Sequence, residues 1–487
     1  MRVFPLLRGA GTPSAQAGRQ RGRDGGSRVS GREIWSLIWP QALTMFFQFT
    51  VGFTDVVVAG RIHPHLQGAL GIITQCQFLL LVLGVALING GLAAVSQAAG
   101  AGLHRRADRY VGLLFKGGIV FSLLTVTGGY VFAGHLLRFL HVPEEIFDLT
   151  LGLWKLLLPV LPAGYLSFLA AAVFRAHKNV RVPLMSVIMV CIVNAAGDAG
   201  LGLGMFGMPR LGAVGIVLAT ILSMFCGALF SLFAMVRAGL AGRRSFASIR
   251  WEKRALPYVL KVALPAGGSQ FLWQLGYMVL FMITGTLPGD SVTAVDGLTA
   301  GMRVEGLLFM PALAFGLTAS ILIGHCLGAG NPEEARRVGL RIAGAGALVM
   351  SLAALCLYPF LPYVTAFVAP DPAVRAVAAD YIVFNLLGTP FSVTSVIMSG
   401  IFSGAGATLY SMAAFSAGTW LVRLPLAWYM GHVVWQNAAG VFSAMLVSQV
   451  VQSAVCLYCF FRREWSGFAS TAGRFGRFAG TDKGKTS

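Results

Sequence analysis

The sequence predicts an all-α integral membrane protein with twelve transmembrane helices, arranged in two six-helix lobes that are related by pseudo-two-fold symmetry along the membrane normal. Three observations predict this fold class: the composition, an internal repeat and the number of long apolar runs. Of the 487 residues, 56% are hydrophobic and only 11% are charged, and the mean hydropathy is +0.74. A soluble domain carries about 25% charged residues, so this chain belongs in a bilayer.

The internal repeat shows that the two halves share one design. The segment VSQAAGAGLHRRADRYVG at 95–112 returns as IGHCLGAGNPEEARRVGL at 323–340. Pro40 and Pro265 form a second pair at nearly the same offset along the chain. A long repeat made of apolar runs is typical of transporters. Because each half holds an even number of runs, both halves enter from the same side of the membrane, and their axis follows the membrane normal.

Twelve apolar runs are long enough to cross a hydrocarbon core of roughly 30 Å as tilted helices. They lie at 34–59, 66–99, 109–134, 147–171, 182–206, 211–236, 256–286, 293–324, 338–364, 376–402, 408–432 and 436–461. Prolines in or beside several runs predict kinks. The loops within each half are short, so consecutive helices are expected to be antiparallel neighbours.

The basic residues lie mostly on one side of this arrangement. Loops after even-numbered runs, with the adjoining helix ends, carry seventeen Lys and Arg, whereas loops after odd-numbered runs carry four. By the positive-inside rule, the even loops and both termini face the cytoplasm. The net charge of +19 therefore marks a membrane side and predicts no nucleic-acid partner. We expect a multi-pass protein of the bacterial inner (plasma) membrane.

The longest polar interruption, the basic stretch 237–261, falls where the repeat predicts a junction. The expected organisation is a disordered basic arm at 1–30, an N-lobe at 31–236, a cytoplasmic linker at 237–255, a C-lobe at 256–462 and a disordered basic tail at 463–487. The arm contains no stretch resembling a signal peptide; lipid binding by the arm and a start codon assigned too early remain open. The seven scattered Cys predict neither disulfides nor a zinc site.

Three of the eighteen acidic residues, Asp55, Asp198 and Glu305, lie deep in apolar runs. An ionised carboxylate at the bilayer centre costs about 2.5 to 3.5 kcal/mol on insertion scales, so it is expected to face a wet cavity or a partner. Gln48 and Asp55 are seven residues apart, and Asn194 and Asp198 are four apart, so each pair shares one helix face. Both faces are candidates for one polar pocket.

Two carboxylates in one apolar pocket provide the minimum machinery for antiport. They raise each other's proton affinity, and desolvation acts in the same direction, so a proton is held near neutral pH until a cation replaces it. Na⁺ would use the same oxygens together with the Asn194 carbonyl, and the sequence leaves H⁺ and Na⁺ open. No cofactor or bound metal is expected. Alternatively, Asn194 and Asp198 only satisfy backbone groups beside the glycine-rich end of the fifth run.

Other polar residues in the runs have simpler interpretations. Arg303 and Arg423 are expected to reach an interface or to pair with a carboxylate on another helix. His325 aligns with Gln97 in the repeat, and an isolated His at this position is expected to make a helix-end contact. The candidate substrate contacts are the polar and aromatic residues Gln270, Trp273, Gln274 and Asn385.

Several motifs together resemble multidrug and toxic compound extrusion (MATE) transporters. They are GFTDVVVAGR, VSQAAGAG and its copy, NAAGDAGLGLG followed by GAVGIVLAT, MRVEGLLFMPALAFGLTASILIGHCLGAG, and SGIFSGAGATLYSM with VRLPLAW. The resemblance covers roughly residues 30–462. It implies export of organic cations and other amphipathic compounds in exchange for H⁺ or Na⁺, by two six-helix lobes that rock between outward- and inward-facing states.

The resemblance also implies roles for residues of the N-lobe. Asp55 matches the family's first-helix aspartate, and Gln48 matches its partner earlier on that helix. Asn194 and Asp198 match an Asn-x-x-x-Asp pair, and Thr220 matches the sixth-helix threonine of the same cation site. This set resembles the DinF-type branch of the family.

The C-lobe lacks two acidic residues that are typical of the NorM-type branch of the family. NorM-type members carry a glutamate in the seventh span and an aspartate in a GAGDT stretch, whereas this chain has FLWQLG around Trp273 and GAGAT with Ala407. Glu305 is then the remaining acidic candidate for coupling in the C-lobe.

The predicted function is a secondary active antiporter, a monomer that exports small amphipathic or cationic compounds. The alternative is a flippase for a lipid or lipid-linked saccharide, which would favour a basic cavity, yet the only candidates are Lys155, Arg303 and Arg423. A major facilitator transporter would carry an Asp-Arg pair ahead of its basic residues after the second span, which GAGLHRRADR matches poorly. A membrane enzyme would need a constellation such as His with Asp, Ser-Lys or Cys-His, and none has suitable spacing, so no enzymatic activity is expected.

Overall fold

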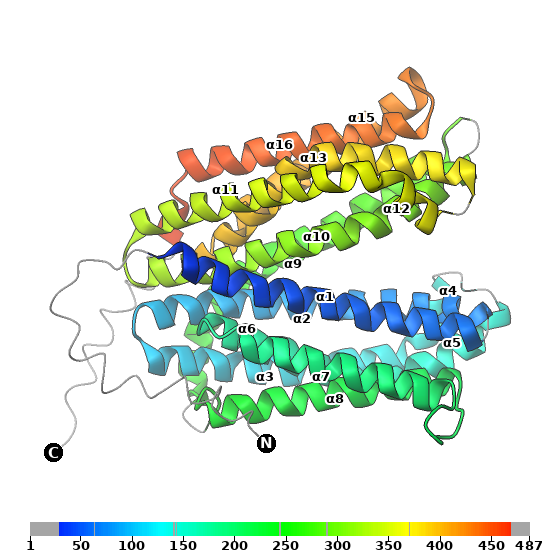
Figure 1. Ribbon diagram of the computed structural model, residues 1–487. Helices are drawn as coiled ribbons and strands as arrows, with labels where there is room; N and C mark the ends of the chain where they lie inside the picture. The colour runs from blue at the N-terminus through cyan, green and yellow to red at the C-terminus, as the bar shows by residue number, and fades with distance from the viewer. Residues whose placement is uncertain are drawn as a thin grey trace, which may run out of the picture.

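The computed structural model describes residues 29–62, 64–139, 142, 144–242, 245–288, 291–369 and 371–468. Within these residues the chain is helical and contains no strand. Helices α1 to α8 form one bundle, and α9 to α16 form a second bundle beside it (Figure 1). The first and last described residues lie at the same end of the two bundles, here named the termini end (Figure 1).

The first bundle consists of eight α-helices and one π-helix. They are α1 (Gly31–Ile62), α2 (Pro64–Gly100), α3 (His104–Val131), α4 (Ala133–Phe139), α5 (Glu144–Leu157), α6 (Val160–Ala176), α7 (Arg181–Gly197), the π-helix η2 (Asp198–Gly202) and α8 (Ala213–Arg237). The run predicted at 147–171 is the pair α5 and α6, bent by 48°. Pro159 lies at this bend, where its ring and missing N–H interrupt the helix.

The second bundle repeats this order with more interruptions. It contains α9 (Ile249–Gly285), α10 (Ser291–Gly328), α11 (Pro332–Leu357), η4 (Tyr358–Phe360), α12 (Leu361–Val368), α13 (Pro372–Ala405), α14 (Thr408–Ser416), η5 (Ala417–Arg423), α15 (Leu424–Tyr429), η6 (Met430–Val434), α16 (Ala438–Arg462) and η7 (Trp465–Phe468). The repeat is visible in the helix bounds. Helices α8 and α16 are both 25 residues long, and their first residues are separated along the chain by the same offset as Pro40 and Pro265.

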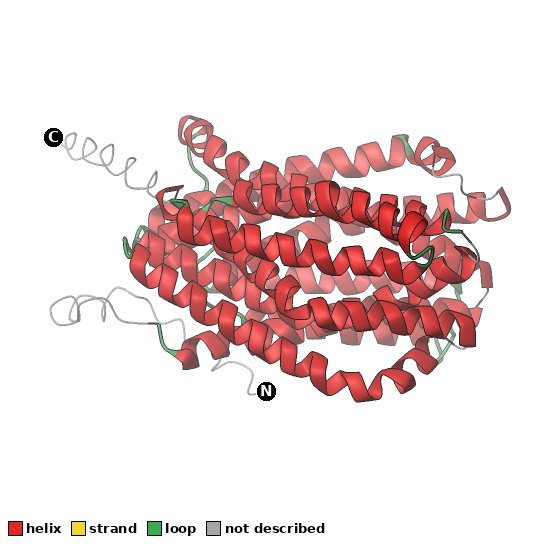
Figure 2. Cartoon of the chain, turned by 90° about the horizontal axis from the view of Figure 1, so that it is seen from above, coloured by secondary structure: helices red, strands yellow, loops and turns green. Residues whose placement is uncertain are grey.

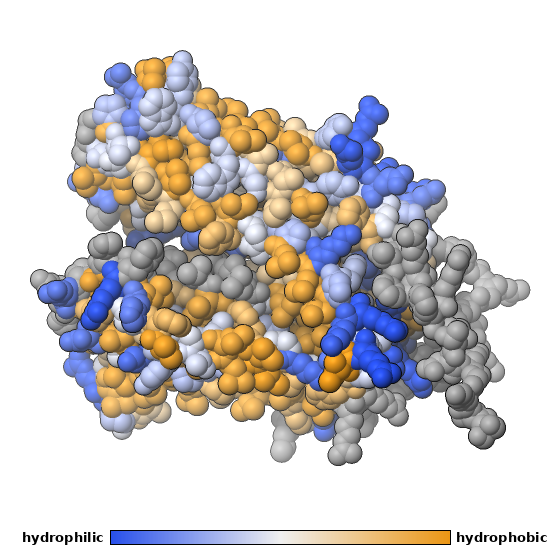
Figure 3. All heavy atoms as spheres, turned by 180° about the vertical axis from the view of Figure 1, so that it is seen from behind, coloured by the Kyte–Doolittle hydropathy of each residue, from blue (hydrophilic) through white to orange (hydrophobic). Residues whose placement is uncertain are grey.

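The twelve predicted runs coincide with helices of the structure. Among the described residues, seven helices are long and apolar enough to cross a membrane, and the bent pair α5 and α6 adds an eighth. The other four runs correspond to α1, α2, α9 and the continuous stretch from α14 to η6. Large apolar side chains cover much of the surface (Figure 3), for example Leu124 at 67% and Phe367 at 86% exposed. Such a surface fits lipid, and the twelve-helix fold is confirmed.

The two bundles meet along α1, α2, α9 and α10. The repeat relates α1 to α9 and α2 to α10, so the interface is built from equivalent helices. One apolar core crosses it: Ile34 and Leu37 of α1 are buried in the same cluster as Leu322 and Ile323 of α10. Seen from above, the helices are joined by short loops (Figure 2), so the chain offers no separate soluble domain among its described residues.

Residue 29 and residues 463–468, which fall within the expected disordered ends, belong to the folded structure. Val29 is buried and its backbone N–H donates to Glu334 Oε1 at 3.1 Å. Trp465 is fully buried, stacks on Phe460 at 5.1 Å between ring centres, and donates from Nε1 to the Phe460 carbonyl at 2.9 Å. Burial of a large aromatic ring with a satisfied N–H orders this segment. The remaining parts, 1–28 and 469–487, lie outside the described residues.

Close contact between α3 and α6 depends on Gly118. A Cβ atom at this position would lie 1.8 Å from Cε1 of the Tyr165 ring. We expect Gly118→Ala to destabilise the protein by about 1–3 kcal/mol, the cost of overpacking. Gly128→Ala on the same helix is the control: its Cβ would meet nothing within 4 Å, so it should be neutral or slightly stabilising. Thermal unfolding of both variants in detergent would test this, and equal midpoints would contradict it.

Candidate functional site

The candidate site of the N-lobe lies where α7 changes into a π-helix. The α-helix ends at Gly197, and Asp198 begins the π-helix η2. π-helical turns are rare and are found frequently at functional sites. Gly197 permits the close approach of α8 here, because a Cβ at Gly197 would lie 2.7 Å from the Ala219 Cβ. Asn194 and Asp198 have no exposed surface at all.

Four of the predicted residues come together at this point. Thr220 Oγ1 on α8 lies 3.5 Å from Asp55 Oδ2 on α1, and Asn194 Nδ2 lies 3.5 Å from the same hydroxyl. The Asp55 and Asp198 carboxyl groups are direct neighbours. The Thr220 hydroxyl is also 3.1 Å from the Ile216 carbonyl, so its single proton can serve only one of the two oxygens at a time.

The cluster contains more acceptors than donors. Within the described chain, Asp55 Oδ1, Asn194 Oδ1 and both carboxyl oxygens of Asp198 are buried and have no hydrogen-bond partner. Burying such oxygens unpaired is costly, and burying an unpaired charge is more so. Such a group of unpaired oxygens fits a proton shared between the two carboxyls, or a hard cation bound through oxygen. The interpretation in which Asn194 and Asp198 only satisfy backbone groups leaves these oxygens unexplained.

Gln48 does not join this cluster, although it was predicted to share the pocket with Asp55. Its side chain is exposed, and among the described contacts no hydrogen bond links it to Asp55, Asn194 or Asp198. Seven residues of helix separate Gln48 from Asp55 by about 10.5 Å along the axis. Sharing a helix face aligns two residues but does not bring them into contact.

Glu305 lies in a second polar cluster, in the C-lobe. The hydroxyl of the buried Tyr381 on α13 donates to Glu305 Oε2. Tyr277 on α9 lies beside Tyr381 and Arg423, and the Arg423 guanidinium carbon is 5.6 Å from the centre of its ring. Arg423 is buried and donates from Nε to Ser448 Oγ at 2.8 Å. Of the two alternatives predicted for Arg423, the ion pair with a carboxylate is not found among the described residues.

The substrate candidates are divided between two places. Asn385 lines a cavity of about 20 Å³ that also contains Glu305. Trp273 packs edge-on against Tyr277, with 4.8 Å between ring centres. Gln270 is half-buried and Gln274 is exposed on the same helix. The structure therefore places Asn385 with Glu305 and connects Trp273 to the same cluster through Tyr277. Among the described contacts, no hydrogen bond links Gln270 or Gln274 to that cluster.

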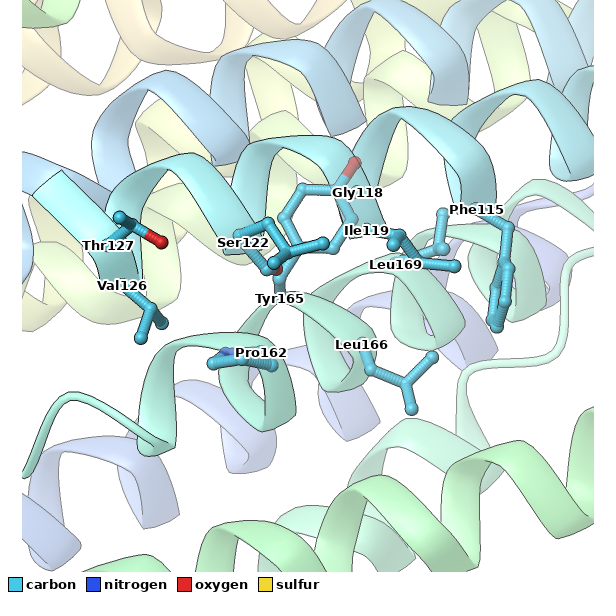
Figure 4. A pocket seen from close by; sticks show the side chains of 11 residues that line it. Phe115, Gly118, Ile119, Ser122, Val126, Thr127, Pro162, Tyr165, Leu166 and Leu169 are labelled. Carbon is cyan, nitrogen blue, oxygen red and sulfur yellow. The ribbon is translucent and has the colours of Figure 1, made fainter.

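The larger cavity of about 340 Å³ contains none of the predicted site residues. It lies between α3 and α6 (Figure 4), and its lining includes Ile119 and Leu123, which are 50% and 62% exposed. The Tyr165 hydroxyl at this groove already donates to the Leu114 carbonyl at 3.2 Å. The groove is therefore apolar and open to the surface of the lobe, and it offers few groups for recognising a polar substrate.

Tyr381 is the site residue that sequence reasoning missed. It lies near the start of the run predicted at 376–402, where a tyrosine is usually explained as an interfacial aromatic. Its contact with Glu305 joins residues 76 positions apart. A tyrosine hydroxyl in an apolar helix needs a hydrogen-bond partner, and this requirement was the available signal.

Comparisons with known proteins agree with the overall fold. The family model described as MatE matches residues 40–199 and 265–429, two segments that begin at the paired prolines. The "Probable multidrug resistance protein NorM" of Thermotoga maritima is 24% identical over 453 residues, covering 89% of this chain and 93% of that protein. "Multidrug resistance protein PmpM" of Pseudomonas aeruginosa is 26% identical over 411 residues, covering 84% and 85%.

A solved structure shows the same fold. The Vibrio cholerae MATE transporter VcmN in the bent form matches with a TM-score of 0.81 at 20% sequence identity, covering 90% of this chain and 98% of that one. At this identity the likeness concerns the fold, and the site has to be argued from the residues of this chain.

Proposed function

The chain belongs to the MatE family, and on that premise we propose that it is a secondary active antiporter that exports small amphipathic or cationic compounds in exchange for H⁺ or Na⁺. Its curated relatives carry names of multidrug resistance proteins, and its twelve helices make it a multi-pass membrane protein. The observation that carries the coupling mechanism is the N-lobe cluster of Asp55, Asn194, Asp198 and Thr220. Four of its buried acceptor oxygens have no hydrogen-bond donor in the part of the chain that the structure describes.

The chemistry of the cluster suits an exchangeable monovalent cation. One proton shared by Asp55 and Asp198 turns two repelling carboxylates into a donor and an acceptor. Na⁺ would instead be held by the oxygens of both carboxylates, Asn194 and Thr220, which is the ligand type that hard cations prefer. Either ion neutralises a charge that the surrounding hydrocarbon disfavours. Ion entry and drug binding then compete for the same negative charge, which couples export to the gradient.

Coupling in this protein follows the DinF-type pattern, with its acidic pair in the N-lobe. Support comes from the C-lobe positions around Trp273 and Ala407, which carry no acidic residue. Glu305 contributes a second, accessory carboxyl, because it lines a cavity with Asn385 and accepts a hydrogen bond from Tyr381. Drug contacts come from Asn385 and from the α9 group of Gln270, Trp273 and Gln274.

The protein works as a monomer in the bacterial inner membrane with both termini in the cytoplasm, and the N-lobe, 31–236, rocks against the C-lobe, 256–462. The asymmetry of Lys and Arg between the loops supports this orientation. The flippase alternative is not favoured, because a pyrophosphate would need free cations in the cavity. Of the three candidate cations, Arg423 donates to Ser448, Arg303 is exposed on α10, and Lys155 on α5 lies over the Tyr130 ring, 5.0 Å from Nζ to the ring centre.

Proteoliposomes loaded with a fluorescent organic cation test the proposal. A proton gradient and a sodium gradient are imposed separately, with protein-free vesicles and ionophore-collapsed gradients as controls. We expect one of the two gradients to drive dye movement against its concentration. If neither gradient moves dye, and the same vesicles move fluorescent lipid between leaflets, the flippase interpretation replaces the antiporter.

A further inference from the structure

The last turns of α2 and α10, which belong to the repeated segment, each form a hydrogen bond with the opposite lobe. Gln97, in the last turn of α2, donates from Nε2 to the Gly404 carbonyl of α13 at 2.9 Å. His325, in the last turn of α10, has its Nε2 2.7 Å from the Ala176 carbonyl at the end of α6, so the ring donates. The repeat that aligns Gln97 with His325 also aligns Ala176 with Gly404, at the same offset along the chain. Each lobe therefore donates the same hydrogen bond to the other.

Two glycines repeat this reciprocity in backbone packing. Gly100 and Gly328 are the last residues of α2 and α10 and occupy equivalent positions of the repeat. A Cβ at Gly100 would lie 2.4 Å from the His325 carbonyl oxygen, and a Cβ at Gly328 would lie 2.1 Å from the Gln97 carbonyl oxygen. Donor and glycine are three residues apart on one helix face in both copies, which gives the repeated pattern Gln/His-x-x-Gly.

The axis that relates these contacts passes between Ser96 and Gly324. These two residues occupy equivalent repeat positions, and they touch each other, since a Cβ at Gly324 would lie 2.7 Å from the Ser96 Cβ. In an isologous interface residue i contacts j and residue j contacts i, and a position on the axis contacts its own copy. The termini end of the protein has this pattern inside a single chain.

The acceptors of these bonds are groups that their own helices leave unsatisfied. The last four carbonyls of an α-helix lack an intrahelical partner. Ala176 ends α6, and Gly404 lies in the last turn of α13. Gln97 is 2% exposed, and its Oε1 accepts from the Tyr258 hydroxyl of the opposite lobe at 2.8 Å. These partners are available only while the two lobes are in contact at this end.

We propose that Gln97, Gly100, His325 and Gly328 form a pseudo-two-fold lock that closes the termini end of the transporter, and that the strength of this lock sets the fraction of molecules with that end closed. The lock rests on the proposed function and deepens it by naming residues that select the transport state. Because one axis relates all four contacts, a rocking motion that separates the lobes here breaks them together. The repeated loop sequence then has a physical reason: the same contact has to be made twice.

Distance measurements between two spin labels test the lock. The labels are placed at Arg105→Cys and Glu333→Cys, which are exposed, repeat-related positions of opposite lobes, in a variant whose seven natural cysteines are replaced. Gly100→Ala and Gly328→Ala are each expected to lower the closed-to-open ratio at least tenfold, because the added Cβ meets backbone that cannot rotate away. Gln97→Ala and His325→Ala should each lower it roughly 2- to 10-fold.

Two controls separate the lock from general damage. Gly344→Ala adds a Cβ that meets nothing within 4 Å and should leave the distances unchanged. The exchanged pair Gln97→His with His325→Gln keeps both donors and should stay closed. The lock is refuted if the glycine variants keep the wild-type distances, if only one alanine donor variant opens the protein, or if the exchanged pair opens as far as the alanine variants. The distances are recorded without drug or gradient, so a failure of the proposed transport would not alter the outcome.

Discussion

Asp198→Asn is expected to reduce ion-driven dye transport in proteoliposomes to the background of protein-free vesicles, while the protein stays folded and at least as stable as the wild type. The amide cannot take up or release a proton, and it removes one charge from the oxygens that would hold Na⁺. Its NH₂ group can donate to the neighbouring Asp55 carboxyl, which has a buried oxygen without a hydrogen-bond partner among the described residues. Satisfying such groups is worth about 1–3 kcal/mol, so the unfolding midpoint should be unchanged or raised.

The matched control for this prediction is Asp371→Asn. Asp371 caps α13 by accepting from the Ala373 and Val374 N–H groups at 2.8 and 3.1 Å. Asparagine caps helices about as well as aspartate, so this variant should transport normally. Wild-type transport by Asp198→Asn under both gradients would contradict N-lobe coupling. A lowered unfolding midpoint together with lost transport would indicate a structural role for the carboxylate.

Trp465→Ala is expected to destabilise the C-terminal region by about 3–5 kcal/mol, the usual cost of removing a fully buried tryptophan. The ring has no exposed surface, stacks on Phe460 and loses its hydrogen bond to the Phe460 carbonyl when truncated. The neighbouring Phe468 lies under the Lys261 ammonium, 4.9 Å from Nζ to the ring centre. The segment should therefore detach from the C-lobe when the ring is removed.

Thermal unfolding and limited proteolysis measure this effect. Membrane proteins often unfold irreversibly, so midpoints have to be compared at one scan rate. Trp39→Ala serves as the control, because this tryptophan of α1 is 41% exposed and its loss should cost much less. If both variants unfold at the same temperature, and residues 463–468 are cleaved no faster in Trp465→Ala than in the wild type, the segment is not anchored by its tryptophan.

The sequence was sufficient for the architecture and for most of the N-lobe cluster. Crossing a bilayer requires long apolar runs whatever their neighbours are, so the twelve spans could be read from composition along the chain. Asp55, Asn194 and Asp198 stand out because polar groups are costly in such runs, whereas Thr220 was implied only by the family resemblance. The structure brings all four together. His325 was expected to contact a helix end, and its bond to the Ala176 carbonyl confirms this.

Other features depend on how the helices are rotated and paired, and only the tertiary structure decided them. A helix in lipid is apolar both toward the lipid and toward its neighbours, so no polar stripe marks the inner face. For this reason the sequence put Gln48 in the pocket and missed Tyr381 beside Glu305. Trp465 was assigned to a disordered tail because the packing that buries its ring exists only in the folded protein. The reciprocal bonds of Gln97 and His325 join residues 307 and 149 positions apart. The repeat along the chain shows that two segments are alike, and only their packing shows that they bind each other's lobe.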